Sequence, residues 1–231
     1  MNEELFDVLD EFHETLIEVE VLIDSAERDQ QDQKRYSTYL KSALLLLSGK
    51  FENFVELAAD TYVYLLNKNN IVASKIPERI RLKHTYVVLD NIQKKKNIPA
   101  SERDIIRMLN EIGAIWIQAD QPFSNLQLEC KFSYGKHGSE ELIKLFSVIG
   151  IENIFDQVDV MLPDATDPNI LTKIDFKGTF NSITGMRNNI LHQNASPNLT
   201  YVDVKNNLLI IKSFSTGLTN LLDSTINALV A

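Results

Sequence analysis

The chain of 231 residues has few cysteines, prolines and glycines: one, six and eight, respectively. The single cysteine, Cys130, excludes an intramolecular disulfide framework and a cysteine-rich zinc site. So few glycines and prolines do not suit a turn-rich β-sandwich and favour long helices instead. The longest uninterrupted apolar run, Ala43 to Leu47, is far shorter than a membrane span.

Most catalytic signatures are also missing from the sequence. It contains no glycine-rich phosphate-binding loop, no HExxH, no Gly-x-Ser-x-Gly and no histidine pair at metal-ligand spacing. We therefore expect no metal and no cofactor. The first residues, Met1 to Glu4, lead into an acidic segment that resembles neither a signal peptide nor a transit peptide. These features predict a cytoplasmic protein with no membrane association.

Helical periodicity dominates what is present, in a chain that is 44% hydrophobic and 24% charged. Apolar residues recur at three- and four-residue steps from Leu5 to Ile23, and again along most of the chain. The pattern predicts an all-α fold with long helices and a single domain over residues 1–231, in which 98–167 is the less certain insertion. The expected helices span about 2–23, 34–67, 77–98, 101–116, 139–149, 152–160, 173–192 and 200–230.

Breaks in the pattern indicate how these helices are joined. Between Asp120 and Gly138 the helical period is lost, and we expect a short strand or an irregular excursion; 163–169 reads as a loop. Gly49 lies inside the second helix, where it predicts a kink or a close helix contact. Ser101, with Asp104 three residues later, resembles a capping box.

The formal net charge is −9, from 23 basic and 32 acidic residues, and this argues mildly against a nucleic-acid partner. One segment runs against that balance. The segment from residue 75 to residue 96 contains seven basic residues and only two acidic ones. A solvated helix face is the more ordinary interpretation, and an approach surface for RNA is the other. The RNA-binding candidates are Arg79, Arg81, Lys83, Lys94, Lys95 and Lys96.

Arg187 is out of place in its helix. The apolar stripe there runs Phe176, Phe180, Ile183 and Ile190, and residue 187 falls on the same face. A charge in that position must be paired, or must face a cleft or a subunit interface. We expect either a structural ion pair with Glu52 or Glu56 of the second helix, or a functional site.

His192 follows Asn188 by four residues, so the two side chains are neighbours on one face, and Thr184 extends that polar stripe by one turn. An amide beside an imidazole can fix its tautomer, as acid–base chemistry requires. The other three histidines lack such a partner in the sequence and are expected to be structural. They are His13, His84 and His137.

The run Arg187-Asn188-x-x-x-His192 resembles the Arg-Asn-x-x-x-His signature of the HEPN superfamily, whose all-helical members include metal-independent endoribonucleases. The motif closes a late helix and precedes a last amphipathic helix, as in that family. The segment 49–54 is similar to a helix of the larger HEPN proteins of bacterial toxin and defence loci. The resemblance covers mainly the N-terminal helices and the chain from residue 173 onward.

The resemblance implies a homodimer in which two motif helices face each other across one cleft. His192 would act as general base or acid for attack of an RNA 2′-hydroxyl on the adjacent phosphate. Arg187 would bind that phosphate, and Asn188 would orient the base or touch the phosphate. The implied role is the toxic effector of a toxin–antitoxin or anti-phage system, with RNA as substrate. An antitoxin or another operon-encoded protein would be a further partner.

Two other interpretations remain open on the sequence. One is a HEPN-like helical dimer that binds a partner protein or a nucleotide without cleaving anything, which would suit the acidic net charge. The other is a helical interaction protein in which Arg187 is only a structural ion pair.

Overall fold

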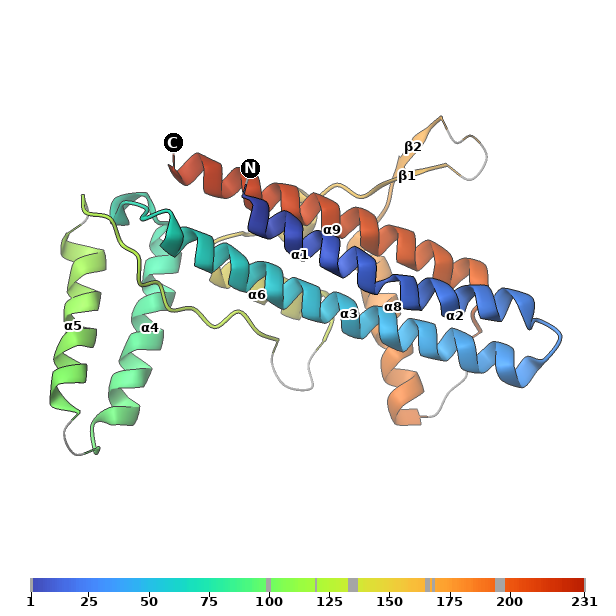
Figure 1. The fold of residues 1–231 in the computed structure, drawn as a ribbon, viewed down its shortest axis with the longest axis horizontal. Coiled ribbons are helices and arrows are strands. Elements are labelled where there is room, and N and C mark those ends of the chain that lie inside the picture. Colours follow the sequence, from blue (N-terminus) through green and yellow to red (C-terminus); the bar gives the residue numbers. More distant parts are fainter. Residues whose placement is uncertain are drawn as a thin grey trace.

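A computed structural model describes residues 2–98, 101–118, 120–132, 137–164, 167, 169–193 and 198–230. Residues 133–136 of the expected excursion, 165, 166 and 168 of the expected loop, Pro99, and the chain ends at 1 and 231 lie outside the described residues. Helices dominate the described chain (Figure 1), which confirms the all-α prediction. The elements are α1 (Glu3–Thr15), α2 (Ile17–Arg28), α3 (Gln33–Lys68), the 3-10 turn η1 (Ala73–Lys75), α4 (Glu78–Lys95), α5 (Glu102–Ile117), α6 (Ser139–Val148), α7 (Ile154–Gln157), β1 (Met161–Pro163), β2 (Leu171–Lys173), α8 (Phe176–Gln193) and α9 (Tyr201–Val230).

The body of the molecule is built around α3, a helix of 36 residues that packs against α1, α2, α8 and α9. The apolar stripe predicted along the first helix is buried, but the helix is divided into α1 and α2 at Leu16. One hydrophobic core runs from Leu5 to Ile226 and includes side chains of α6, α7 and the segment 123–130. The helices that position Arg187, Asn188 and His192 therefore share one apolar interior.

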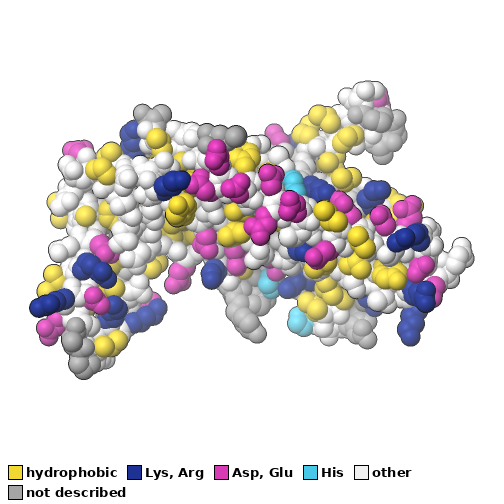
Figure 2. All heavy atoms as spheres, in the orientation of Figure 1, with side chains coloured by type: hydrophobic (Ala, Val, Ile, Leu, Met, Phe, Trp, Pro, Cys, Tyr) yellow, Lys and Arg dark blue, Asp and Glu magenta, His cyan; other side chains and the backbone are white. Residues whose placement is uncertain are grey.

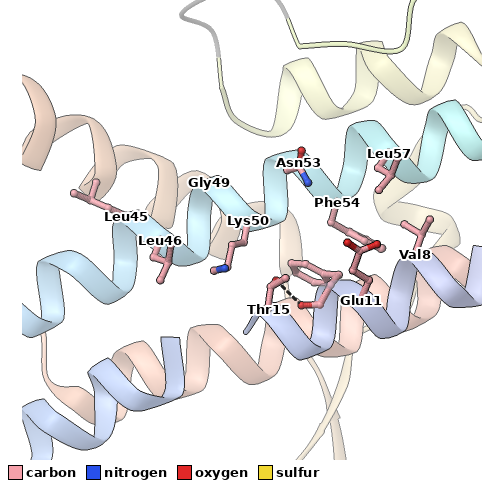
Figure 3. A pocket seen from close by; sticks show the side chains of 11 residues that line it. Val8, Glu11, Thr15, Leu45, Leu46, Gly49, Lys50, Asn53, Phe54 and Leu57 are labelled. Carbon is pink, nitrogen blue, oxygen red and sulfur yellow. Dashed lines mark hydrogen bonds between the residues drawn. The ribbon is translucent and has the colours of Figure 1, made fainter. Parts of the chain in front are cut away.

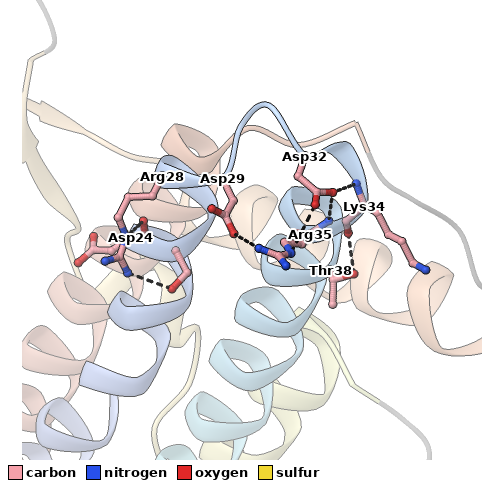
Figure 4. Close-up of polar contacts among 8 residues, drawn as sticks. Asp24, Arg28, Asp29, Asp32, Lys34, Arg35 and Thr38 are labelled. Atoms are coloured by element: carbon pink, nitrogen blue, oxygen red, sulfur yellow. Dashed lines mark hydrogen bonds and ion pairs between the residues drawn. The ribbon is translucent and has the colours of Figure 1, made fainter.

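The turn from α2 to α3 shows how the long helix begins (Figure 4). The Asp32 carboxylate caps α3 by accepting from the backbone N–H groups of Lys34 and Arg35, both at 3.1 Å. Arg35 in turn lies 3.4 Å from Asp32 and 3.8 Å from Asp29. A capped start and a charged turn fix where α3 begins, and the apolar stripe that follows fixes which face it buries.

An aromatic cluster joins α8 to α3. The Phe51 ring meets Phe180 and Phe176 edge-on, with ring centroids 5.2 and 5.9 Å apart. Phe176 stacks on Phe214 of α9 at 3.8 Å. Since Phe51 directly precedes Glu52, this packing also sets which α8 residues lie beside the Glu52 carboxylate.

Several local predictions are wrong. Helix 152–160 is only the single turn α7, because the chain becomes extended at Val158 and enters β1. The helix expected from residue 173 begins at Phe176, because Lys173 pairs with Met161 in an antiparallel two-stranded sheet. Ser101 precedes α5 but does not form a capping box, since its hydroxyl donates to the carbonyls of Lys95 and Ile98.

Gly49 also differs from its prediction. It is exposed within the continuous helix α3, and an added Cβ would meet no heavy atom within 4 Å. No close helix contact therefore requires glycine there. The excursion after α5 contains no strand between Phe123 and Phe132, apart from an isolated bridge of Val72 with Pro122 just before it.

Candidate active site on helix α8

Helix α8 carries Arg187, Asn188 and His192 on its C-terminal half. Phe180 and Ile183, the apolar residues that precede the motif on the same stripe, are fully buried. The Arg187 side chain follows them and is only 18% exposed, whereas His192 is exposed. The structure thus places a charged group at the edge of the core, one and a half turns before an imidazole in solvent.

Glu52 of α3 lies beside Arg187. The Arg187 Nη2 and Glu52 Oε2 atoms are 3.8 Å apart, and the glutamate side chain is 14% exposed. Glu56, the other acid considered from the sequence, is engaged elsewhere and accepts a hydrogen bond of 2.8 Å from the Phe132 backbone N–H. The contact with Glu52 is an ion pair at the outer limit of distance, without an aligned hydrogen bond.

His137 is the site residue that sequence reasoning missed. Its Nδ1 atom lies 3.1 Å from Glu52 Oε1, off the direction of a hydrogen bond, and its side chain is 19% exposed. The Ser48 hydroxyl lies 3.4 Å from the same Glu52 oxygen. Glu52 is therefore shared between Arg187 and His137, two residues fifty positions apart in the chain.

A glycine and an amide hold His137 in this place. Gly138 has φ of 122° and precedes α6, a backbone conformation that essentially only glycine adopts. The following backbone N–H, of Ser139, donates to Asn181 Oδ1 of α8 at 3.0 Å. The His-Gly pair was the only sequence signal, since a glycine beside a helix start indicates an unusual turn.

The polar stripe of α8 is only partly as predicted. Asn188 Oδ1 accepts from Arg187 Nη1 at 3.2 Å, so the amide touches the guanidinium. Thr184 is buried and its hydroxyl donates to the Phe180 carbonyl at 2.9 Å, so it does not extend the polar face. Within the described residues, no hydrogen bond joins Asn188 to His192.

The C-terminal half of α8 projects out from beneath α3 (Figure 1). Leu191 is 52% exposed there, and Gly185 leaves open space, since an added Cβ would meet no heavy atom within 4 Å. Within the described residues, the motif histidine thus has exposed apolar area beside it.

The basic segment lies on α4, at one end of the molecule and apart from the projecting end of α8 (Figure 1). Four of its six candidate residues are engaged within the chain. Arg79 pairs with Glu152, Lys94 with Asp90 and Lys95 with Asp104, and the Arg81 guanidinium lies 4.7 Å above the Trp116 ring. Among the described residues, Lys83 and Lys96 have no such partner.

A groove of about 350 Å³ opens between α1 and α3 (Figure 3). Gly49 and Asn53 line it from α3, and Phe12 and Glu11 from α1. Lys50 also lines it and pairs with Glu18 at 3.0 Å. Arg187, Asn188 and His192 are not among the lining residues, so the groove is separate from the motif.

Two kinds of feature are absent from the described residues. No cluster of three or more histidine, cysteine, aspartate or glutamate side chains there has the arrangement to hold a metal ion. No helix in the same part of the chain combines the length and apolar character needed to cross a membrane.

Comparison with known proteins gives one match. A family model described as RiboL-PSP-HEPN matches residues 10–224. The matched range covers α3, α8 and most of the other elements, including the motif. No curated protein and no solved structure shows significant similarity to the chain.

Proposed function

The chain belongs to the RiboL-PSP-HEPN family, and from this premise we propose that it is a metal-independent endoribonuclease that uses Arg187, Asn188 and His192. The observation that carries the proposal is the placement of the motif. A guanidinium at the edge of the core and an imidazole in solvent share the exposed end of one helix. This pairs a phosphate-binding cation with an imidazole, which can serve as a general base or acid.

The proposed chemistry is transfer of the phosphate within the RNA chain. The His192 imidazole takes the proton of a 2′-hydroxyl, the 2′-oxygen bonds to the adjacent phosphorus, and the bond to the 5′-oxygen breaks. Arg187 binds the phosphate and stabilises the added charge in the transition state. The leaving 5′-oxygen takes a proton from a second acid, and the products are a cyclic phosphate and a 5′-hydroxyl.

A homodimer would supply that second acid. Two copies related by a twofold axis along the projecting ends of α8 would bring a second His192 and a second Arg187 to the same cleft. Exposed Leu191 provides apolar area for this contact. In this arrangement one protomer's histidine acts as base while its partner's acts as acid.

Glu52 bears on how the site is used. Its carboxylate now faces the Arg187 guanidinium at 3.8 Å, where a substrate phosphate would compete for the same cation. We propose that Glu52 holds Arg187 in place before RNA binds. The distance leaves room for this, since no aligned hydrogen bond has to break.

We further propose that this activity is toxic and belongs to a toxin–antitoxin or anti-phage system in the cytoplasm. A ribonuclease whose chemistry resides entirely in its side chains would act on RNA as soon as it folds, so a partner must restrain it. Induced expression of the protein from a repressible promoter would then stop cell growth, and the Arg187→Gln substitution would relieve this arrest.

The second candidate is a non-catalytic dimer that binds a protein or a nucleotide. One observation favours it: Glu52 already neutralises Arg187, so the motif carries no excess positive charge to attract RNA. The same experiment separates the two functions, because a binding module leaves RNA intact.

The test is cleavage of mixed cellular RNA by the full chain in EDTA, with the new ends identified chemically. We expect cyclic-phosphate and 5′-hydroxyl ends from wild type, and at least a hundredfold loss with Arg187→Gln, as is typical when a charge-stabilising donor is removed (about 10²–10³-fold). Arg107→Gln is the matched control, because Arg107 lies on α5, is 67% exposed and is close to Asp104 and Glu111; this variant should cleave normally. Intact RNA with wild type would favour the binding module.

A further inference from the structure

Exposed apolar side chains form a stripe along α4. Leu82, Tyr86 and Leu89 follow each other at four- and three-residue steps and are 40%, 56% and 46% exposed. That spacing places them on one face of the helix. Ile80 and Val88 of the same helix are fully buried, so α4 has an ordinary core face as well. The stripe is therefore apolar surface beyond what the core needs.

Helix α5 carries a matching stripe. Ile106 and Leu109 are 58% and 51% exposed, and Ile105, Ile112 and Trp116 beside them are only half-buried. The core-facing residues of α5 lie on its other side and are Met108 and Ile115.

The two stripes lie on the same side of the α4–α5 hairpin. The antiparallel helices meet where Trp116 Nε1 donates to Thr85 Oγ1 at 2.8 Å and where Lys95 pairs with Asp104 at 2.7 Å. Successive residues of an α-helix are rotated by about 100° about its axis, which places Leu82, Tyr86 and Leu89 on the side of α4 opposite Ile80. The same rotation along the antiparallel helix α5 places Leu109 on the same side of the hairpin. The indole of Trp116 lies at the seam between the stripes.

The charge of the hairpin differs from that of the rest of the chain. Residues 78–117 carry eight basic and five acidic residues, a net charge of +3, and the remaining residues carry 15 basic and 27 acidic ones, a net charge of −12. Figure 2 shows basic side chains gathered over the free end of the hairpin and acidic ones over α1 and α3. Besides Arg81, which lies over the Trp116 ring, five charged residues of the described hairpin have no ion-pair partner, the basic Lys83, Lys96 and Arg103 and the acidic Glu78 and Glu102, so the unpaired charge is also net positive.

We infer that the outer face of the α4–α5 hairpin docks an amphipathic helix of a partner protein, with an apolar stripe flanked by acidic residues. The two apolar rows would receive the partner's stripe, as in helix-in-groove recognition. The unpaired cations of the rim would meet the partner's carboxylates. The inference stands on this face alone and does not require the ribonuclease activity.

Two other occupants fit the face less well. A second copy bound through the same face would set two basic rims against each other, which is unfavourable. RNA would need free cations along a backbone track, but four of the six basic candidates of α4 are engaged within the chain. Apolar rows of leucine and isoleucine also offer nothing to a phosphate.

The chain provides its own reporter for the test, because Trp116 is its single tryptophan. The probe is a synthetic helical peptide of 20 residues with a leucine stripe flanked by glutamate, and the comparison peptide has lysine in place of every glutamate. With the full chain we expect a saturable shift of Trp116 emission on adding the glutamate peptide. Binding of the lysine peptide should be at least tenfold weaker.

Variants locate the binding. Leu109→Asp on α5 and Tyr86→Ser on α4 should each weaken binding of the glutamate peptide by about tenfold or more. Each substitution removes apolar area that the bound peptide would bury. Val21→Asp, at a residue of α2 that is 56% exposed, is the matched control and should bind as wild type. Using two variants on different helices guards against one that misfolds, and circular dichroism identifies such a case.

Other outcomes overturn the inference. No emission change with the glutamate peptide, or equal binding of both peptides, would show that the face does not select an acidic helix. Binding of single-stranded RNA that Leu109→Asp abolishes would assign the face to RNA. Self-association of wild type that Leu109→Asp abolishes would assign it to a second copy.

Discussion

Glu52 is the residue on which the motif geometry depends. Its carboxylate faces Arg187 at 3.8 Å and His137 at 3.1 Å, and all three side chains are less than 20% exposed. Without Glu52, the Arg187 guanidinium would lie at the edge of the core without this counter-charge. The Glu52 carboxylate lies close to both side chains, although it forms an aligned hydrogen bond with neither.

Replacing Glu52 tests this role. Glu52→Gln keeps the shape of the side chain but leaves Arg187 without its counter-charge, so we expect the free energy of unfolding to fall by about 1–2 kcal/mol. Glu18→Gln is the matched control, because its carboxylate pairs with Lys50 but is 68% exposed, and its loss should cost less than about 0.5 kcal/mol. Urea denaturation measures both, and equal effects would contradict a special role for Glu52.

His84 supplies a pH dependence. Burial lowers its pKa from 6.5 to about 4, and its Nδ1 accepts from the Gln127 backbone N–H at 3.0 Å. Between pH 6.5 and 4 the unfolded chain therefore binds a proton that the native state does not. Stability from this group is complete above pH 6.5 and is lost as pH falls toward 4, with a slope of at most about 1.4 kcal/mol per pH unit.

His84→Gln should remove that slope. Unfolding by guanidinium at pH 7 and at pH 4.5 should show a smaller loss of stability for the variant than for wild type. Burial also lowers the pKa of His13, with the same sign, so part of the dependence persists. Parallel losses in both proteins would contradict the assignment to His84.

Helical periodicity determined which residues of the site could be predicted from the sequence. Arg187 could be identified because four apolar residues define the helical face on which it falls. His137 was not, since its partner Glu52 lies 85 positions earlier and meets it only through the packing of α3, α6 and α8. A contact across that distance leaves no local pattern in a single sequence.

At the scale of elements, long amphipathic helices were predictable and short irregular elements were not. The bounds of α3 and α9 fall within one residue of those expected, because many apolar positions define them. Strands β1 and β2 have three residues each, and most of these residues are exposed. Such short strands show no apolar alternation from which they could be predicted. Likewise, Ser101 is a residue type that often caps helices, but its hydroxyl donates to the carbonyls of Lys95 and Ile98 in the preceding segment.

Two glycines should respond oppositely to alanine. Gly49 is helical, exposed and surrounded by open space, so Gly49→Ala should stabilise the protein by about 0.5–1 kcal/mol. Gly138 has φ of 122°, so Gly138→Ala should destabilise it by about 1–3 kcal/mol. Thermal unfolding of the two variants measures the difference, and a shared sign would show that backbone conformation does not govern these positions.

At the scale of the whole molecule, the two regions for which we propose functions are separate. The motif lies at the projecting end of α8, and the basic, apolar hairpin α4–α5 lies at one end of the bundle (Figure 1). A protein with net charge −9 can offer such a hairpin only because the acidic residues gather elsewhere. The net charge of the whole chain therefore does not show how charge is distributed over its surface.

The proposed dimer through α8 predicts an effect on activity. Leu191→Asp places a charge on the proposed interface, so we expect a shift from dimer to monomer in sedimentation velocity and at least a tenfold loss of RNA cleavage. Ile17→Asp, at a residue of α2 that is 57% exposed, should leave both unchanged. A monomeric but fully active Leu191→Asp protein would mean that one chain suffices.

The most direct test of the central claim is the rate of RNA cleavage in EDTA by wild type and by His192→Ala, both shown to be folded by circular dichroism. The account predicts cleavage by wild type, with cyclic-phosphate ends, and none by the variant. Equal cleavage by the two proteins would contradict a ribonuclease centred on His192.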